Sequence, residues 1–279
     1  MSSDTIHVHQ CALIITLRCT LNCKLCLVYA PYYKDPKDYP LSEVERSIDT
    51  YFKLIDTCGT FNIQGGEPLI HPDLPAIVRK VAQYRGRIDK ILLTTNGTLL
   101  PSPALIKVLS EFKESIQVNI SDYGPELSKK VPQLITVLEQ NLIPYHVINY
   151  NGSHIHFGGW LDFTDHTLKH QTEEALIENA SKCGYRNGGN LAIRNGEIFF
   201  CYRVARRIEL GIIEKNELSC VDMFDHRTIS EKRQNIKEIL NAKYTPACAY
   251  CIGKQSGAVH HPPAEQLTKE ELVTGVERI

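Results

Sequence analysis

The cysteines of this sequence fall into two groups whose spacing could hold metal. The early group has the pattern C-x3-C-x2-C and consists of Cys19, Cys23 and Cys26. The late group consists of Cys183, Cys201, Cys248 and Cys251. Cys11, Cys58 and Cys220 make up the total of ten and belong to neither group. The sequence carries no export signal, so we expect a reducing compartment, where clustered cysteines bind metals rather than form disulfides.

The early group can hold an iron–sulfur cluster with one open position. Three thiolates at these spacings can wrap one face of a 4Fe–4S cube and leave the fourth iron free for an external ligand. Structural zinc sites are closed by four ligands, usually as two matched C-x2-C pairs. We therefore favour iron–sulfur ligation by Cys19, Cys23 and Cys26, with a structural zinc loop as the alternative.

The composition excludes several classes of protein. Of the 279 residues, 43% are hydrophobic, which is enough for one large core with a small appendage. Lysine and arginine number 31 against 32 for aspartate and glutamate, so no overall charge favours nucleic acid or an anionic membrane. The apolar run at residues 11–17 is too short to span a bilayer. We expect a cytoplasmic protein with no nucleic-acid or membrane partner.

Strand and helix patterns alternate through the first half of the chain. Strands are predicted at residues 12–17, 59–64, 88–95, 116–121 and 144–150. Helices are predicted at residues 41–55, 74–84, 103–112 and 125–140. Strands separated by helices of this length form βαβ units and a parallel sheet, either open or curled into a barrel. The early cysteines directly follow the first strand, at the edge where such folds place their active sites.

Polar or glycine-rich segments follow the next strands at the same predicted edge. The second strand ends in Gln64-Gly65-Gly66-Glu67-Pro68, where paired glycines let the backbone approach a ligand closely. Asn96 follows the third strand and Ser121 ends the fourth. Either residue alone could be a helix cap, but the ordered series at successive strand ends favours a binding site. Ile148, on the fifth strand, could pack on a bound ring or be an ordinary core residue.

These motifs together resemble the radical SAM superfamily, whose members carry the same cysteine spacing and a Gly-Gly-Glu-Pro loop. The resemblance implies a partial (β/α)6 TIM-like barrel, S-adenosylmethionine (SAM) as cofactor, a cluster on the early cysteines, and an external electron donor such as flavodoxin or ferredoxin. It also implies reductive cleavage of SAM to a 5′-deoxyadenosyl radical. The SAM contacts carried over are Leu25, Gly65, Gly66, Glu67, Asn96, Ser121 and Ile148. Leu25 departs from the family, which often has an aromatic residue there.

The late cysteines belong to a segment of different character. Short strands at residues 191–193 and 197–200 flank Asn195-Gly196, which predicts a type I′ hairpin turn. With Cys183, Gly196, Cys201 and the closing C-x2-C pair, the segment resembles the twitch or SPASM-like domains that hold an auxiliary 4Fe–4S cluster. Zinc on the same four cysteines is the alternative. The predicted domains are a barrel at 1–165, a small α+β twitch domain at 166–260, and a tail at 261–279.

Several residues suggest the substrate. Arg203, Arg206 and Arg207 suit a phosphate or carboxylate, although a solvated surface is the simpler interpretation for at least two of them. In the loop after the barrel, His154, His156, Trp160 and Asp162 are candidates for contacting a polar ring. Cys220 could donate a hydrogen atom to a substrate radical, replace a cluster ligand, or be an inert buried thiol.

The resemblance favours a small polar substrate. Since no substantial segment precedes the first strand, we expect no leader-binding domain of the kind that peptide-modifying relatives carry. The specific hypothesis is epimerisation or dehydrogenation of a carbohydrate or aminocyclitol, by an epimerase or an oxidoreductase. Modification of a peptide or protein and a non-catalytic zinc or iron–sulfur module are the alternatives.

Overall fold

One twisted sheet of eight strands runs through the computed structural model, which describes residues 5–253 and 257–272. Its strand order is β5-β4-β3-β2-β1-β7-β8-β9. The N-terminal strands are β1 (His7–Ile14), β2 (Thr57–Gln64), β3 (Ile88–Thr95), β4 (Ile116–Asp122) and β5 (Tyr145–Asn149). Each of them pairs in parallel with its neighbour. The α/β fold and the mainly parallel sheet predicted from the sequence are therefore confirmed.

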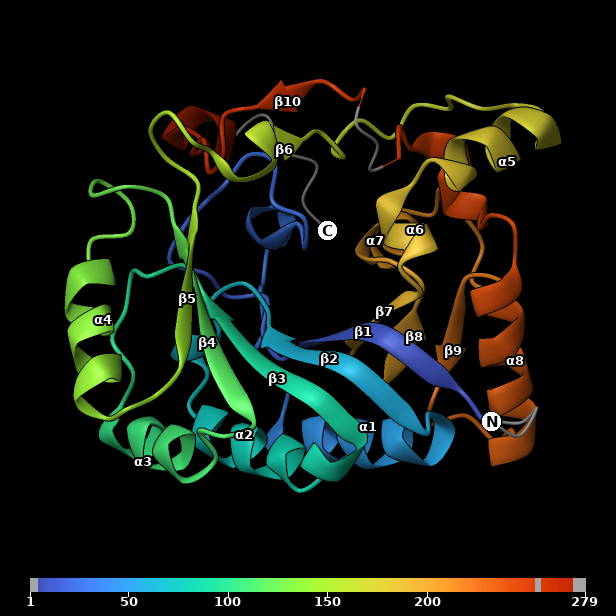
Figure 1. Cartoon of the computed structure of the whole chain (residues 1–279). Helices are drawn as coiled ribbons and strands as arrows, with labels where there is room; N and C mark the ends of the chain where they lie inside the picture. Colours follow the sequence, from blue (N-terminus) through green and yellow to red (C-terminus); the bar gives the residue numbers. More distant parts are fainter. Residues whose placement is uncertain (1–4, 254–256, 273–279) are drawn as a thin grey trace.

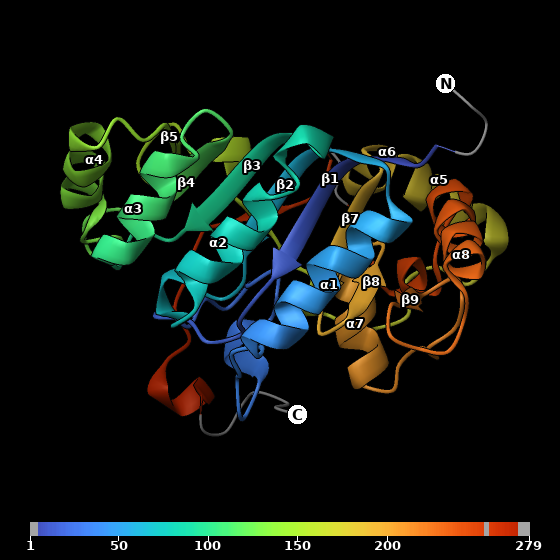
Figure 2. The same ribbon diagram turned by 90° about the horizontal axis from the view of Figure 1, so that it is seen from below.

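Helices cover the outer face of this sheet. The connections carry α1 (Leu41–Leu54), α2 (Leu74–Ala82), α3 (Pro103–Glu111) and α4 (Val131–Gln140). Figures 1 and 2 show α1, α2 and α3 side by side beneath the strands. α4 begins later than predicted because Pro132 has no N–H to donate and fits only in the first turn of a helix. Within residues 5–253 and 257–272, every helix is too short or too polar to span a bilayer.

The central strand β1 is buried on both faces. Cys11 and Leu13 pack into the main core with residues of α1 such as Ile48 and Tyr51. Ala12 and Ile14 face the opposite side, in a smaller cluster with Ala192 and Tyr202. Because both faces are buried there, the second half of the strand is a continuous run of apolar residues without polar alternation. Cys11 and Cys58 are core residues, so neither is available as a ligand.

The C-terminal part extends the same sheet. β7 (Asn190–Arg194) pairs in parallel with β1, and β8 (Glu197–Phe199) and β9 (Cys220–Asp222) follow as antiparallel strands. Asn195 and Gly196 both have positive φ, 51° and 77°, as a type I′ turn requires. The helices of this part are α5 (Glu173–Ser181), α6 (Gly184–Asn187), α7 (Tyr202–Glu209) and α8 (Ile229–Asn241). The sheet is continuous across the boundary predicted at residue 165.

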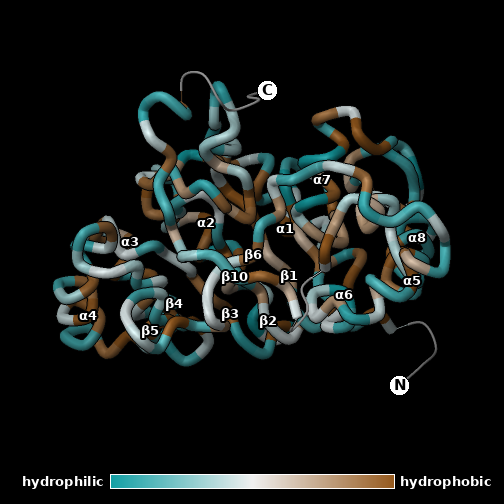
Figure 3. Tube along the Cα trace, turned by 90° about the horizontal axis from the view of Figure 1, so that it is seen from above, coloured by the Kyte–Doolittle hydropathy of each residue, from teal (hydrophilic) through white to brown (hydrophobic). Residues whose placement is uncertain are grey.

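The sixth barrel strand does not join this sheet. β6 (Trp160–Leu161) instead pairs with β10 (His260–His261) in an antiparallel ribbon. Figures 1 and 3 show this ribbon across the sheet from α1 and α2, above the inner face of β1–β3. β7 takes the position on the other side of β1. Residues of β1, β2, β6 and β10 line one cavity between the sheet and the ribbon.

Candidate active site and second cysteine centre

The early cysteine loop is held by the backbone of the Gly-Gly-Glu segment. The N–H of Gly66 donates to Thr16 O and the N–H of Glu67 to Arg18 O, both at 2.8 Å. A Cβ built at Gly66 would lie 2.1 Å from Arg18 O and 3.1 Å from the Cβ of Cys19. At Gly65 it would lie 2.5 Å from Thr16 O. The two glycines are therefore needed because the chain leading into the cysteines passes directly against them.

Glu67 ties this segment to the end of β3. Its carboxylate is fully buried and accepts hydrogen bonds from Thr95 Oγ1 at 2.8 Å, from the N–H of Asn96 at 2.8 Å and from the N–H of Leu69 at 3.0 Å. Burial raises the pKa of Glu67 to about 7, while these three hydrogen bonds act to lower it. The sequence assigned Glu67 to a SAM contact, whereas in the structure its side chain connects two motif loops.

Asn96 connects the same region to the cysteine loop. Its Nδ2 donates to Thr20 Oγ1 at 3.0 Å and to Cys19 Sγ at 3.6 Å. Its Oδ1 accepts from both the N–H and the hydroxyl of Thr98. These partners satisfy the amide. Asn96 therefore positions Cys19, a role that the sequence-based assignment as a SAM contact did not foresee.

The three early cysteines gather in one cluster with Leu21, Tyr123, Leu127, Trp160 and Ala264. Burial raises the pKa of the Cys19 thiol to about 12, and that of Cys26 also rises through burial. Among the described residues, no three Cys, His, Asp or Glu side chains are close enough to hold a single metal ion. A 4Fe–4S cluster does not require this, because each thiolate binds a different iron.

A segment near the C-terminus covers the cysteine loop. The N–H of Lys24 donates to Glu265 O at 2.7 Å, and the N–H of Leu267 donates to Asn22 O at 2.8 Å. Gln266 contributes its side chain, since Nε2 donates to Cys23 Sγ at 3.3 Å and Oε1 accepts from the N–H of Asn22 at 2.8 Å. Sequence reasoning assigned this segment to a tail, because a lone glutamine carries no motif.

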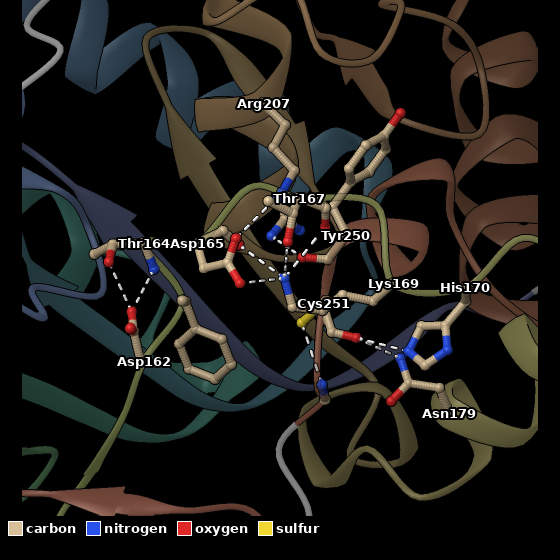
Figure 4. Close-up of polar contacts among 12 residues, drawn as sticks. Asp162, Thr164, Asp165, Thr167, Lys169, His170, Asn179, Arg207, Tyr250 and Cys251 are labelled. Carbon is tan, nitrogen blue, oxygen red and sulfur yellow. Dashed lines mark hydrogen bonds and ion pairs between the residues drawn. The ribbon is translucent and has the colours of Figure 1, made fainter.

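The early cysteine loop borders a large cavity of about 740 Å³. Leu25 and Leu27 line it beside the cysteines, and Gln10 and Gln64 line it from β1 and β2. The facing side includes Tyr150, Phe157, Trp160 and Phe163. Of the four loop residues singled out in the sequence, Trp160 lines this cavity, while Asp162 accepts hydrogen bonds from Thr164 (Figure 4).

Six of the seven predicted SAM contacts lie outside the lining of this cavity. Ser121 is buried at the end of β4, where its carbonyl accepts a hydrogen bond from Ser128 Oγ at 3.3 Å. Ile148 lies on the edge strand β5 and is partly buried. Of the predicted SAM contacts, only Leu25 belongs to the lining of the 740 Å³ cavity.

Comparison with known proteins decides the family of this region. Residues 13–136 match the model of the radical SAM superfamily, which covers the cysteine loop, the Gly-Gly-Glu segment and Asn96. This segment is a radical SAM domain. Its cofactors in the superfamily are SAM and a 4Fe–4S cluster.

Curated relatives match over part of their length. A GTP 3′,8-cyclase of Sulfurovum sp. (strain NBC37-1) is 29% identical over 119 residues, which are 43% of this chain and 36% of that protein. A GTP 3′,8-cyclase of Aquifex aeolicus (strain VF5) is 33% identical over 121 residues, 42% of this chain and 36% of that protein. The alignments thus span about a third of these relatives.

A solved structure supports the fold over most of the chain. The crystal structure of BtrN in complex with AdoMet and 2-DOIA aligns with a TM-score of 0.50 and 14% identity, covering 85% of this chain and 83% of that one. At this identity the likeness concerns the fold alone.

Beyond the radical SAM domain, the four late cysteines line one cavity. Cys183 precedes α6, Cys201 caps α7, and Cys248 and Cys251 lie in the loop after α8. Three arginines line the same cavity, namely Arg186, Arg203 and Arg207. The tertiary structure thus brings together four thiols separated by up to 68 residues in sequence, in surroundings that favour a negative charge.

Residues from three elements hold the loop of Cys248 and Cys251 (Figure 4). Asn179 Nδ2 donates to Cys251 O at 2.9 Å, and a ring nitrogen of His170 lies 3.1 Å from the same oxygen. Arg207 donates to Ala247 O at 2.8 Å and to Tyr250 O. Neither Asn179 nor His170 could be identified from the sequence, because the partner of each is a backbone carbonyl group of a distant loop.

The arginines after Cys201 are buried, which corrects the interpretation that most of them form a solvated surface. Arg203, Arg206 and Arg207 have exposed fractions of 4%, 2% and 0%. Arg206 lies over the rings of Tyr29 and Tyr33, with its Cζ 5.8 and 5.0 Å from their centroids. Burial of three guanidinium groups is costly unless negative charge or aromatic faces compensate it.

Cys220 lies away from both cavities, in the hydrophobic core on β9 opposite Phe199. Burial raises the pKa of its thiol to about 11. This position gives no support to the assignment of Cys220 as a hydrogen donor or replacement ligand. Of the three sequence-based interpretations, the buried inert thiol agrees with its position.

Glu67 gives a testable pH dependence. Its pKa rises from the ordinary value of 4.5 to about 7, so the folded protein retains a proton that the unfolded chain releases between these values. Wild-type stability therefore falls relative to Glu67→Gln as the pH rises from about 4.5 to about 7, by at most about 3 kcal/mol. Urea unfolding of both metal-free proteins across this range measures the difference. If the difference in unfolding free energy between wild type and Glu67→Gln stayed constant across this pH range, the prediction would be contradicted. The exposed Glu126→Gln is the control, and its difference from wild type should stay constant.

Proposed function

We propose that this protein is a radical SAM enzyme that abstracts a hydrogen atom from a small polar substrate. The carrying observation is the placement of Cys19, Cys23 and Cys26 in one loop at the carboxyl edge of the sheet, beside a 740 Å³ cavity. When bound, a 4Fe–4S cluster with SAM at its open iron supplies the electron that cleaves SAM to a 5′-deoxyadenosyl radical.

The residues around the early cysteines suit such a cluster. The glycine segment lies directly against the chain that leads into the cysteine loop. Amide groups of Asn96 and Gln266 donate to the sulfur atoms of Cys19 and Cys23. Amide donors stabilise thiolates, which are the ligands an iron–sulfur cluster needs. Leu25 would pack on SAM from the cavity side, and the backbone of Gly65 and Gly66 would contact its amino group. Glu67 and Asn96 would fix the loops that make these contacts.

The cavity favours a small molecule. Its volume lies in the range of pockets that enclose single small ligands, and polar groups of Gln10, Gln64 and Asn190 face it together with aromatic rings. A sugar or aminocyclitol offers hydroxyl groups for the amides and apolar C–H faces for the rings. We infer a carbohydrate-like substrate on this basis.

A second 4Fe–4S cluster is proposed on Cys183, Cys201, Cys248 and Cys251. Four thiols lining one cavity complete the ligand set, and three arginines there would balance the negative charge of a four-thiolate cluster. When bound, such a cluster supplies one-electron redox chemistry. This favours oxidation of the substrate over epimerisation, for which Cys220 was the candidate hydrogen donor. An external flavodoxin or ferredoxin would deliver the initiating electron.

A nucleoside triphosphate is the second candidate substrate. The observation in its favour is that the curated relatives matching the radical SAM domain are named GTP 3′,8-cyclases. The buried guanidinium of Arg203 on the cavity wall would suit a phosphate.

Metal analysis tests the two clusters. After anaerobic reconstitution, we expect about eight iron and eight sulfide per wild-type chain. Replacing Cys19, Cys23 and Cys26 with alanine should leave about four iron, and so should replacing the four late cysteines. Cys58→Ala is the matched control, since that thiol lies in the core, and it should retain about eight. Zinc in the late site, or about four iron in the wild type, would contradict the second cluster.

Isotope transfer tests the substrate and the reaction. With reduced enzyme, SAM and a carbon-deuterated sugar or aminocyclitol, we expect deuterium in 5′-deoxyadenosine and a product oxidised by two electrons. Cys26→Ala should abolish both, because it removes a ligand of the proposed SAM-binding cluster. Parallel reactions with GTP and with peptides provide the comparison. Transfer from those substrates alone would contradict the carbohydrate-like class, and solvent deuterium at the abstracted carbon would indicate epimerisation.

Gln266 provides a test of the cluster position. Its amide donates to Cys23 Sγ, and a hydrogen bond to a ligating sulfur raises the reduction potential of an iron–sulfur cluster. Gln266→Met should therefore shift the midpoint potential of the SAM-binding cluster to a more negative value, measured by redox titration with electron paramagnetic resonance. The exposed Gln140→Met serves as the control. An unchanged potential at full iron content would contradict the assignment.

A further inference from the structure

Arg203 separates the four-cysteine cavity from the large cavity. It is the second residue of α7, two positions after Cys201. Its side chain lines both cavities, and Tyr185 is the other residue with this double position. Only 4% of Arg203 is exposed to solvent. A positive charge thus occupies the wall between the proposed substrate and the late cysteines.

No carboxylate or hydrogen-bond acceptor among the described residues pairs with this guanidinium. One face lies over the ring of Phe163, with Cζ 3.9 Å from the centroid. Arg203 lines one cavity with the thiols of all four late cysteines. An aromatic face offsets part of the cost of burying a cation, but full compensation needs an anion nearby.

The neighbouring arginines have other roles. Arg207 donates to the carbonyl groups of Ala247 and Tyr250 and so holds the cysteine loop in place. Arg206 donates to Tyr32 O at 3.5 Å and lines neither cavity. Arg203 is therefore the member of this group that lines both cavities.

We propose that Arg203 raises the reduction potential of the auxiliary cluster from its substrate-facing side. The inference rests on the proposed cluster at Cys183, Cys201, Cys248 and Cys251. Four thiolates around an oxidised 4Fe–4S core give a net charge of about −2, and reduction adds one more negative charge. A fixed positive charge in a water-poor wall stabilises the reduced form more than the oxidised form.

This role gives the wall a chemical function. A cluster with a raised potential accepts an electron more readily, so Arg203 would bias the auxiliary cluster toward acceptance rather than donation. Arg203 lies on the side of the four-cysteine cavity that borders the large cavity, so its charge acts where an electron from the substrate would arrive. A guanidinium is suited to this because it stays protonated when buried.

The test isolates the auxiliary cluster. In the full chain, Cys19, Cys23 and Cys26 are replaced with alanine, so that the remaining paramagnetic signal comes from the late cysteines. Arg203→Met, Arg203→Gln and Arg203→Lys are compared in this background by iron analysis and by redox titration. Arg206→Met is the matched control, since it removes an equally buried charge from the same helix.

We expect both neutral variants to shift the midpoint potential to more negative values, while Arg203→Lys and Arg206→Met stay close to the parent. An unchanged potential in Arg203→Met or Arg203→Gln with full iron would overturn the inference. If the neutral variants lose iron, retention by Arg203→Lys supports the role of charge, and loss by Arg203→Lys overturns it. A parent background without any iron would instead contradict the auxiliary cluster itself.

Discussion

The close approach of two backbone segments is the constraint on which the active-site region depends. Gly65 and Gly66 allow the chain after β2 to hydrogen bond with Thr16 and Arg18, which extends the β1–β2 pairing to the first cysteine. A side chain at either glycine would force the segments apart. The position of the cysteine loop is thus fixed by backbone hydrogen bonds, which do not depend on flexible side chains.

Buried charges mark both proposed centres. Near the early cysteines, the carboxylate of Glu67 is satisfied by three donors and joins the ends of β2 and β3. At the late cysteines, Arg207 donates to two backbone carbonyls, whereas Arg203 lines the two cavities. A buried charge with hydrogen-bond partners fixes structure, and one without a hydrogen-bonding partner in the protein is available to a charged ligand.

The strand β1 links the two centres physically. It leads into the early cysteine loop at its carboxyl end and pairs with β7, whose hairpin leads to Cys201 and α7. Its alternate residues contribute to the main core and to the cluster with Tyr202. Both centres are therefore mounted on one continuous sheet, with the 740 Å³ cavity bordered by elements from each side.

Local patterns were enough to predict the strand and helix order of the N-terminal part, the Asn195-Gly196 turn and the grouping of the cysteines. Periodicity, turn chemistry and ligand spacing are properties of short stretches of sequence. Tertiary structure decided what depends on distant partners. It paired β7 with β1 and buried Cys220 in the core. It also brought the side chain of Gln266 into hydrogen-bond contact with Cys23, and that of Asn179 with the late cysteine loop. A long-range hydrogen bond to a backbone or sulfur atom leaves no periodic pattern, so only the folded chain reveals it.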